Sequence, residues 1–129
     1  MGRFAIIGLL LLGFLLPGMP LPVSAAPSAK AKAEITRLME VLSSSGCRFQ
    51  RNGSWYEAAE ARAHLQRKYD YLLKKNRVDN AEQFIERAAS VSSMSGRVYK
   101  VKCGNTEQDA SDWFDGQLQR LRGSGATTR

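Results

Sequence analysis

The stretch Cys47-Arg48-Phe49-Gln50-Arg51-Asn52-Gly53 predicts a short strand followed directly by a turn. Its cysteine has one possible disulfide partner within the chain, which lies far along the sequence. Apolar and polar side chains alternate over Cys47–Gln50, a pattern typical of a strand with one buried face. Asn52-Gly53 indicates a turn, because this dipeptide tolerates positive φ. A second alternating stretch, Tyr99–Cys103, ends in the other of the two cysteines. Together they predict a two-stranded antiparallel pair closed by one disulfide.

We expect this disulfide between Cys47 and Cys103, because the uncharged N-terminus predicts export and two cysteines of an exported chain pair in an oxidising compartment. They lie 56 positions apart. For a loop of this length, the loss of chain entropy in the unfolded state stabilises the fold by about 4 kcal/mol. The alternatives are a metal pair or a reactive thiol. The chain has no Cys-x-x-Cys spacing and one histidine, so we expect no metal site and no cofactor.

Four helices are expected to cover the strand pair. The first runs from Ala33 to a stop at Gly46, with apolar residues spaced i, i+3, i+4 and i+7. The second starts at Ser54 in a capping box with Glu57 and reaches about Lys75. Its predicted apolar face is Ala58, Ala61, Leu65, Tyr69 and Leu72.

The third helix is expected to open at Asp79, with Glu82 completing the capping pattern. Ser111 is expected to cap the last helix. The predicted fold class is therefore α+β and mainly helical, with about four helices packed on two short antiparallel strands.

The N-terminus predicts export. Arg3 precedes a run from Phe4 to Ala26 that carries no charge, and the run ends in prolines and small residues, which is typical of a cleaved signal peptide. We expect a signal peptide over 1–25. An uncleaved anchor is the alternative, but the helix-compatible part before the prolines is shorter than the roughly 20 residues of a membrane span. After cleavage we expect no stable membrane span.

The remaining chain is long enough for one small domain. We expect a flexible lead-in over 26–33, a globular domain over 34–122 and a disordered polar tail over 123–129.

The formal charge is +7, and loss of Arg3 with the signal peptide leaves +6. Such a surface attracts anions, and its densest basic groups are Lys68, Lys74, Lys75 and Arg77, then Arg97, Lys100 and Lys102. No known nucleic-acid-binding motif accompanies them, so nucleic acid is not the expected partner.

His64 is the single histidine of the sequence. Glu60, His64 and Lys68 are spaced i, i+4 and i+8 on the second helix, so that Glu60 is placed to orient the imidazole for acid–base work. The alternative, which we favour, is a surface or boundary histidine in a charged row. Ser92, Ser93 and Ser95 are the candidate nucleophiles, and no nucleophile motif surrounds them. We therefore assign no catalytic residue.

The segment Ser92–Tyr99 contains the tentative binding residues Ser93, Ser95, Arg97 and Tyr99, to which we add His64. Its hydroxyls, backbone amides and guanidinium suit an anion or a carboxylate. The alternative is a turn whose serines lead into the strand.

The assembled segments resemble the YfeK-like family of uncharacterised proteobacterial periplasmic proteins. The resemblance rests on motifs between Glu34 and Arg122, among them Ser45–Phe49, Arg51–Gly53, Ser92–Gly96 and Tyr99. It implies a periplasmic location and a shared small fold, and it assigns no activity. The short motif Ser95-Gly96-Arg97-Val98-Tyr99 is also similar to one in periplasmic lysozyme inhibitors.

The sequence thus favours a periplasmic binding or interaction module whose partner is an envelope protein or anionic envelope material. The alternatives are a small periplasmic hydrolase that uses His64 and an inhibitor of a cell-wall-degrading enzyme.

Overall fold

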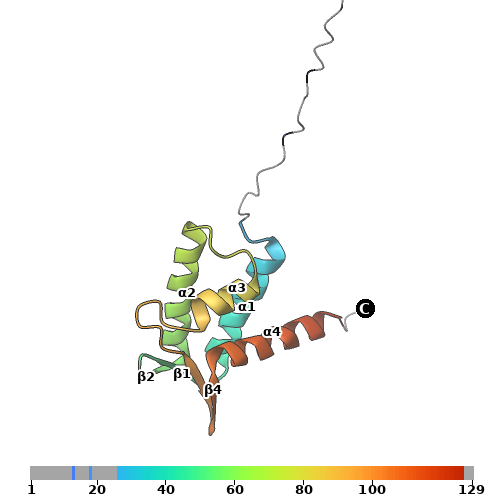
Figure 1. Ribbon diagram of the computed structural model, residues 1–129. Coiled ribbons are helices and arrows are strands. Elements are labelled where there is room, and N and C mark those ends of the chain that lie inside the picture. Colours follow the sequence, from blue (N-terminus) through green and yellow to red (C-terminus); the bar gives the residue numbers. More distant parts are fainter. Residues whose placement is uncertain (1–12, 14–17, 19–25, 127–129) are drawn as a thin grey trace, which may run out of the picture.

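The computed structural model describes Gly13, Gly18 and residues 26–126. Apart from those two glycines, the predicted signal peptide lies outside the described residues, as do residues 127–129 of the predicted tail. The described chain combines helices with one sheet whose strands follow the order β2-β1-β3-β4. Figure 1 shows the helices gathered at one end of this sheet and its hairpins pointing away from them.

The central strand pair agrees with the sequence prediction. β1 (Arg48–Arg51) and β3 (Lys100–Cys103) are antiparallel, with Phe49 opposite Val101. Both of these side chains are buried, whereas Arg48 and Lys102, their neighbours along the strands, are exposed. One face of the sheet therefore supplies core residues and the other faces solvent, as the alternation predicts.

The prediction of only two strands is wrong, because each central strand carries a further hairpin partner. β2 (Ser54–Glu57) pairs with β1, and β4 (Thr106–Asp109) pairs with β3. Asn52 and Gly53 take φ of 49° and 83°, the two positive values that a tight two-residue hairpin turn requires. Ser54 therefore pairs with Arg51 across this turn and does not cap a helix.

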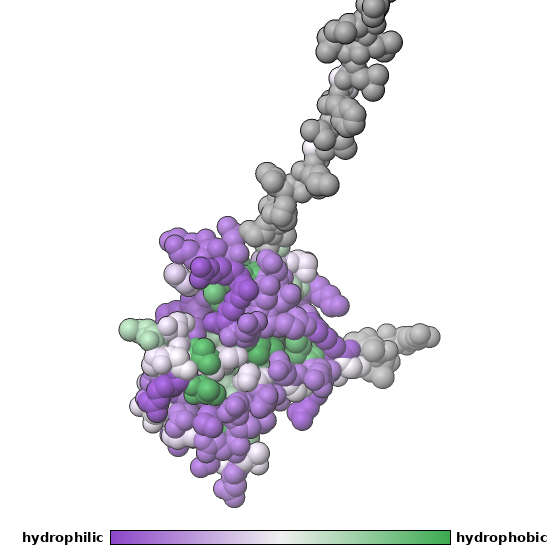
Figure 2. Space-filling view, in the orientation of Figure 1, coloured by the Kyte–Doolittle hydropathy of each residue, from purple (hydrophilic) through white to green (hydrophobic). Residues whose placement is uncertain are grey.

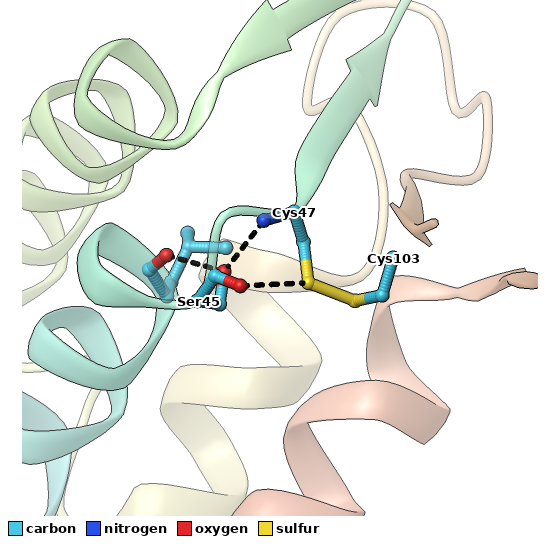
Figure 3. The surroundings of a disulfide bond; sticks show 4 residues. Ser45, Cys47 and Cys103 are labelled. Carbon is cyan, nitrogen blue, oxygen red and sulfur yellow. Dashed lines mark hydrogen bonds between the residues drawn. A yellow bond between two sulfur atoms is a disulfide. The ribbon is translucent and has the colours of Figure 1, made fainter. Parts of the chain in front are cut away.

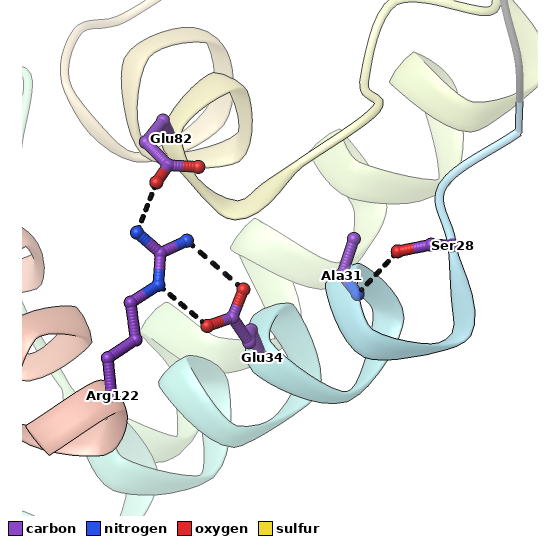
Figure 4. Close-up of polar contacts among 5 residues, drawn as sticks. All are labelled: Ser28, Ala31, Glu34, Glu82 and Arg122. Carbon is purple, nitrogen blue, oxygen red and sulfur yellow. Dashed lines mark hydrogen bonds and ion pairs between the residues drawn. The ribbon is translucent and has the colours of Figure 1, made fainter. Parts of the chain in front are cut away.

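The helix ends also differ from the predicted ones. α1 (Ala29–Ser44) begins within the predicted lead-in, because the Ser28 hydroxyl accepts a hydrogen bond from the Ala31 amide (3.1 Å; Figure 4). α2 (Ala58–Lys74) begins only after β2, and its N-cap residue Glu57 makes no side-chain capping bond. α4 (Ala110–Ala126) includes Ser111 inside the helix and extends into the predicted tail.

The third helix is short and changes its winding. α3 (Ala81–Phe84) is capped by Asn80, one residue after the predicted Asp79, and the Asn80 side chain accepts from the Gln83 amide at 2.8 Å. It continues as a π-helix, η1 (Ile85–Ala89). Such wide turns are rare and occur often at functional sites. The sequence prediction contained no sign of this change.

The predicted disulfide is present and joins the start of β1 to the end of β3. Cys47 is 5% exposed and bonded to Cys103. The Cys47 amide donates to the Ser45 hydroxyl at 3.0 Å, and the sulfur lies 3.7 Å from the Ser45 carbonyl oxygen (Figure 3). The disulfide thereby also fixes the chain between α1 and the sheet.

The core lies between the inner face of the sheet and the helices. α1 contributes its predicted stripe of Ile35, Leu38, Met39 and Leu42, all at most 1% exposed. The predicted face of α2 is buried as well, and α4 adds Trp113, Phe114 and Leu118. No helix among the described residues is long and apolar enough to cross a membrane.

Candidate functional site

A groove of about 910 Å³ runs between α2, η1 and the loop 91–98. Its charged lining consists of Arg67, Lys68, Arg77, Arg87 and one carboxylate, Glu86. Tyr71, Leu72 and Val91 supply its apolar surface. This volume lies in the range of ligand pockets, and the excess of cations favours anions. We call it the basic groove.

Helical periodicity places the α2 residues of the groove on one face. His64, Arg67, Lys68 and Tyr71 are spaced i, i+3, i+4 and i+7, so their side chains form one row. The buried face of α2, with Ala61 and Leu65, holds the helix against the core. The row is therefore presented by a rigid element.

The opposite wall comes from η1 and from the connection after α2. The Arg87 guanidinium donates to the Arg77 carbonyl oxygen at 2.6 Å, which keeps two cationic residues close to each other. Glu86 and Arg87 both line the groove and both belong to the π-helix.

His64 lines the groove and lies between a cation and a phenol. Arg51 Nη1 lies 2.7 Å from His64 Nδ1, and His64 Nε2 lies 3.2 Å from the Tyr99 hydroxyl. A guanidinium can only donate, so Nδ1 accepts and the proton of the neutral ring is on Nε2. Burial, followed by the charges of Arg51, Lys68 and Arg67, lowers the pKa of His64 to about 4. The imidazole is therefore neutral at pH 7.

Lys68 connects α2 to the loop. Its ammonium donates to the Val91 carbonyl oxygen at 3.0 Å and to the Tyr99 hydroxyl at 3.2 Å. It also lies 4.8 Å from the centre of the Tyr99 ring, within the range of a cation–π contact. Burial, and then the charge of Arg51, lowers the pKa of Lys68 to about 8. The amine is mostly protonated at pH 7, and a bound anion would favour that form further.

Tyr99 joins these groups from beneath the groove. Its side chain is 1% exposed, and its ring packs against Phe49 at a centroid distance of 5.1 Å. The Tyr99 hydroxyl accepts from both Lys68 and His64. Burial raises the pKa of Tyr99, against the opposing effect of the Arg51 charge. Tyr99 is thus a buried organiser of the site and no direct surface for a partner.

The serines of the loop 91–98 bind the loop to itself and to the β1–β2 turn. The Ser92 hydroxyl accepts from the amides of Met94 and Ser95, each at 3.3 Å. The Ser95 hydroxyl donates to the Asn52 side-chain oxygen at 2.6 Å. The Arg97 guanidinium lies against Gly53, where a Cβ would be 3.4 Å from its nitrogens. The hydroxyls of Ser92 and Ser95 therefore make hydrogen bonds within the protein.

The tentative binding residues therefore divide into two sets. His64 and Ser93 line the basic groove, with Tyr99 below them. Ser95 and Arg97 instead lie on the side of the loop that meets the Asn52–Gly53 turn. Sequence reasoning missed Arg51, Arg67 and Arg87; only Arg67 carried a signal, because it shares the helix face of His64 and Lys68.

The predicted pairing of Glu60 with His64 does not describe the contacts of the imidazole, because its two nitrogens are within hydrogen-bond distance of Arg51 and Tyr99. Glu60 lines a separate pocket of about 170 Å³ that also reaches Arg51 and His64. Within the described part of the chain, no group of three or more His, Cys, Asp or Glu residues could hold a metal ion.

The fold and the groove define a small α+β protein with one disulfide and a groove lined mainly by cations. Residues 29–122 match DUF5329, a family of unknown function, and the chain belongs to this family. It is 37% identical over 82 residues to the uncharacterized protein YfeK of Salmonella typhimurium, across 63% of this chain and 67% of that protein. The predicted resemblance is thus confirmed. No solved structure matches the chain.

Proposed function

We propose that the protein is a binding module of the cell envelope that holds an anionic ligand in the basic groove. The observation that carries this proposal is a cavity of about 910 Å³ lined by four cationic side chains and one carboxylate. Arginine forks and a lysine ammonium bind phosphates and carboxylates through charge-assisted hydrogen bonds. A low-dielectric wall next to such charges strengthens the attraction.

The location in the envelope is part of the proposal. It rests on the signal-like N-terminus and on the disulfide between Cys47 and Cys103. Disulfides persist in oxidising compartments such as the bacterial periplasm.

The geometry supports binding better than the two alternatives. A hydrolase would need His64 to accept a proton from a nucleophile, yet Arg51 occupies Nδ1 and Tyr99 lies at Nε2. An inhibitor acting through the Ser95–Tyr99 motif would need an accessible Tyr99, and that side chain is 1% exposed. Tyr99, whose hydroxyl contacts both His64 and Lys68, fits the role of positioning Lys68 in the groove lining.

The test is a titration of the oxidised protein with glycerol 3-phosphate, followed by NMR chemical shifts. We expect saturable shifts in α2 and η1, and their loss in the variant Arg67→Gln/Arg77→Gln. Both side chains are exposed groove residues. The matched control, Lys32→Gln/Lys102→Gln, removes the same charge from exposed positions outside the groove lining. If both double variants weaken the binding of glycerol 3-phosphate equally, the binding depends on net charge and not on the groove, and the proposal is overturned.

A further inference from the structure

The large hydrophobic side chains that are exposed in the described chain gather around one place, the rim of the basic groove. They are Tyr71, Val91, Met94 and Val98, of which Met94 is 97% exposed. Tyr71 and Val91 line the groove itself. Val91 and Val98 form an antiparallel bridge at the base of the loop that carries Met94. Single exposed apolar residues are ordinary, but a cluster marks an interaction site.

The loop holds Met94 outward on a firm support. The Ser92 amide donates to the Arg97 carbonyl oxygen, and the Gly96 amide donates to the Ser92 carbonyl oxygen, each at 2.9 Å. Lys68 ties Val91 to α2 on one side, and Asn52 ties Ser95 to the β1–β2 turn on the other. The exposure of Met94 is therefore built into the loop.

Cations surround these apolar side chains. Arg67, Lys68, Arg77 and Arg87 lie along the groove, and the Lys75 ammonium lies 5.8 Å from the centre of the Tyr71 ring. In Figure 2, pale and green atoms lie at the loop beside α2, within a largely purple hydrophilic surface. An apolar tip beside a basic groove is complementary to a surface that offers both hydrocarbon and negative charge.

We propose that the basic groove and the loop 91–98 dock together on an anionic phospholipid surface. Met94 and Val98 enter the boundary between headgroups and acyl chains, and the groove cations bind lipid phosphates. Binding of this kind gains from buried apolar area and from attraction to anionic lipids. The inference rests on the proposed function, because it names the source of the anion that the groove binds.

The exposed apolar loop next to the cations favours a lipid surface over a small soluble anion as occupant. A free phosphate would use the groove cations and leave Met94 in water. A phospholipid supplies a phosphate for the groove and hydrocarbon for the loop in one assembly. The attraction must also weaken with salt, because the cations are exposed to screening.

The test is co-sedimentation with vesicles of phosphatidylglycerol and phosphatidylcholine, compared with phosphatidylcholine alone. We expect the oxidised protein to bind the mixed vesicles only. Met94→Ser/Val98→Ser should lower partitioning by about tenfold or more, as expected for apolar burial lost from two side chains. Met94→Leu should retain it. Arg67→Gln/Arg77→Gln should lose it, while Lys32→Gln/Lys102→Gln should keep most of it.

Glycerol 3-phosphate separates the two proposals. Saturable binding of glycerol 3-phosphate without vesicle binding would overturn the membrane inference and leave the proposed function standing. Failure of both would overturn both. Vesicle binding that is unchanged by Met94→Ser/Val98→Ser would also overturn the inference, provided that melting curves show these variants folded like the parent.

Discussion

Arg51, the last residue of β1, donates a hydrogen bond of 2.7 Å to Nδ1 of His64 on α2, so a half-buried histidine in its neutral form accepts from a cation. The contact joins the sheet to the helix that carries the basic groove. The pKa of His64 lies below its ordinary value because burial, and then the charges of neighbouring cations, oppose protonation of the imidazole.

We therefore expect His64 to titrate with a pKa of about 4. The measurement is the pH dependence of its ring proton shifts by NMR. Arg51→Gln should raise this pKa toward the ordinary value of 6.5, because the nearest opposing charge is gone. Arg48→Gln, a neighbouring arginine of the same strand, should leave it unchanged. An ordinary pKa in the parent protein would show that the imidazole is not held by Arg51.

The same shift predicts a pH dependence of stability. Because the pKa of His64 is lower in the folded chain than the unfolded value of 6.5, the unfolded chain takes up the proton first as the pH falls. The free energy of unfolding should therefore decrease between pH 6.5 and pH 4. His64→Gln should lose less stability over this window than the parent, as measured by urea midpoints at pH 7 and 4.5. Equal losses would contradict the linkage.

The disulfide is expected to supply a large share of the stability. Cys47→Ala/Cys103→Ala should lower the free energy of unfolding by about 4 kcal/mol for residues 56 apart, out of a total of about 5–15 kcal/mol for a domain of this size. Urea unfolding measures it. Dithiothreitol should destabilise the parent by a similar amount and leave the double variant unaffected. A parent that resists the reductant while its thiols are shown to be free would count against the prediction.

Elements with strong apolar periodicity could be predicted from the sequence. The stripe of α1 and the buried face of α2 are apolar residues at helical spacing, and they are buried as expected. β1 and β3 alternate around Phe49 and Val101 and pair as expected. In each case the signal lies in the side chains themselves.

β2 and β4 could not be predicted in this way. Neither strand has a fully buried residue, so both lack the alternation of a half-buried strand. They are edge strands defined by their turns at Asn52-Gly53 and Gly104-Asn105 and by backbone pairing. Ser54 and Glu57 match a capping box, so their pattern predicts the start of a helix, whereas the Asn52-Gly53 turn pairs them with β1 as a hairpin.

In the site, too, some residues could be placed from local sequence patterns and others could not. His64 and Lys68 could be placed on one helix face from their spacing, and the structure has them there. Arg51 comes to His64 only through the packing of the β1–β2 hairpin on α2, and Arg87 reaches Arg77 through the π-helix. Long-range packing of this kind leaves no local pattern.

Asn52 is expected to control the order of the loop 91–98. Asn52→Ala removes the acceptor of the 2.6 Å bond from Ser95 and leaves alanine at a φ of 49°. Amide exchange of residues 92–97 should become faster, because the loop loses its tie to the β1–β2 turn. Asn76→Ala is the matched control: it places alanine at a similar φ of 54° in the turn that follows α2. Faster exchange in the loop of both variants would assign the effect to backbone strain alone.

Arg122 is expected to couple α4 to α1 and α3. It donates to Glu34 at 2.8 and 3.1 Å and also bonds Glu82 (Figure 4). The Glu34 side chain is only 14% exposed. A double-mutant cycle of Glu34→Gln and Arg122→Gln should therefore give a coupling free energy of about 1 kcal/mol, the upper end for ion pairs near the surface. The exposed pair Arg37 and Glu40 on α1 should give less than about 0.5 kcal/mol.

Acid should remove this coupling. Hydrogen bonds from Arg122 lower the pKa values of Glu34 and Glu82 below 4.5, so both carboxylates contribute stability above that pH and lose it as the pH falls through their folded pKa values. Urea unfolding of the four cycle proteins at pH 7 and pH 3 measures the change. The coupling should shrink at pH 3, when the unfolded carboxylates are protonated. If instead the coupling persists unchanged at pH 3, the contact is held by packing of the arginine side chain and not by its charge.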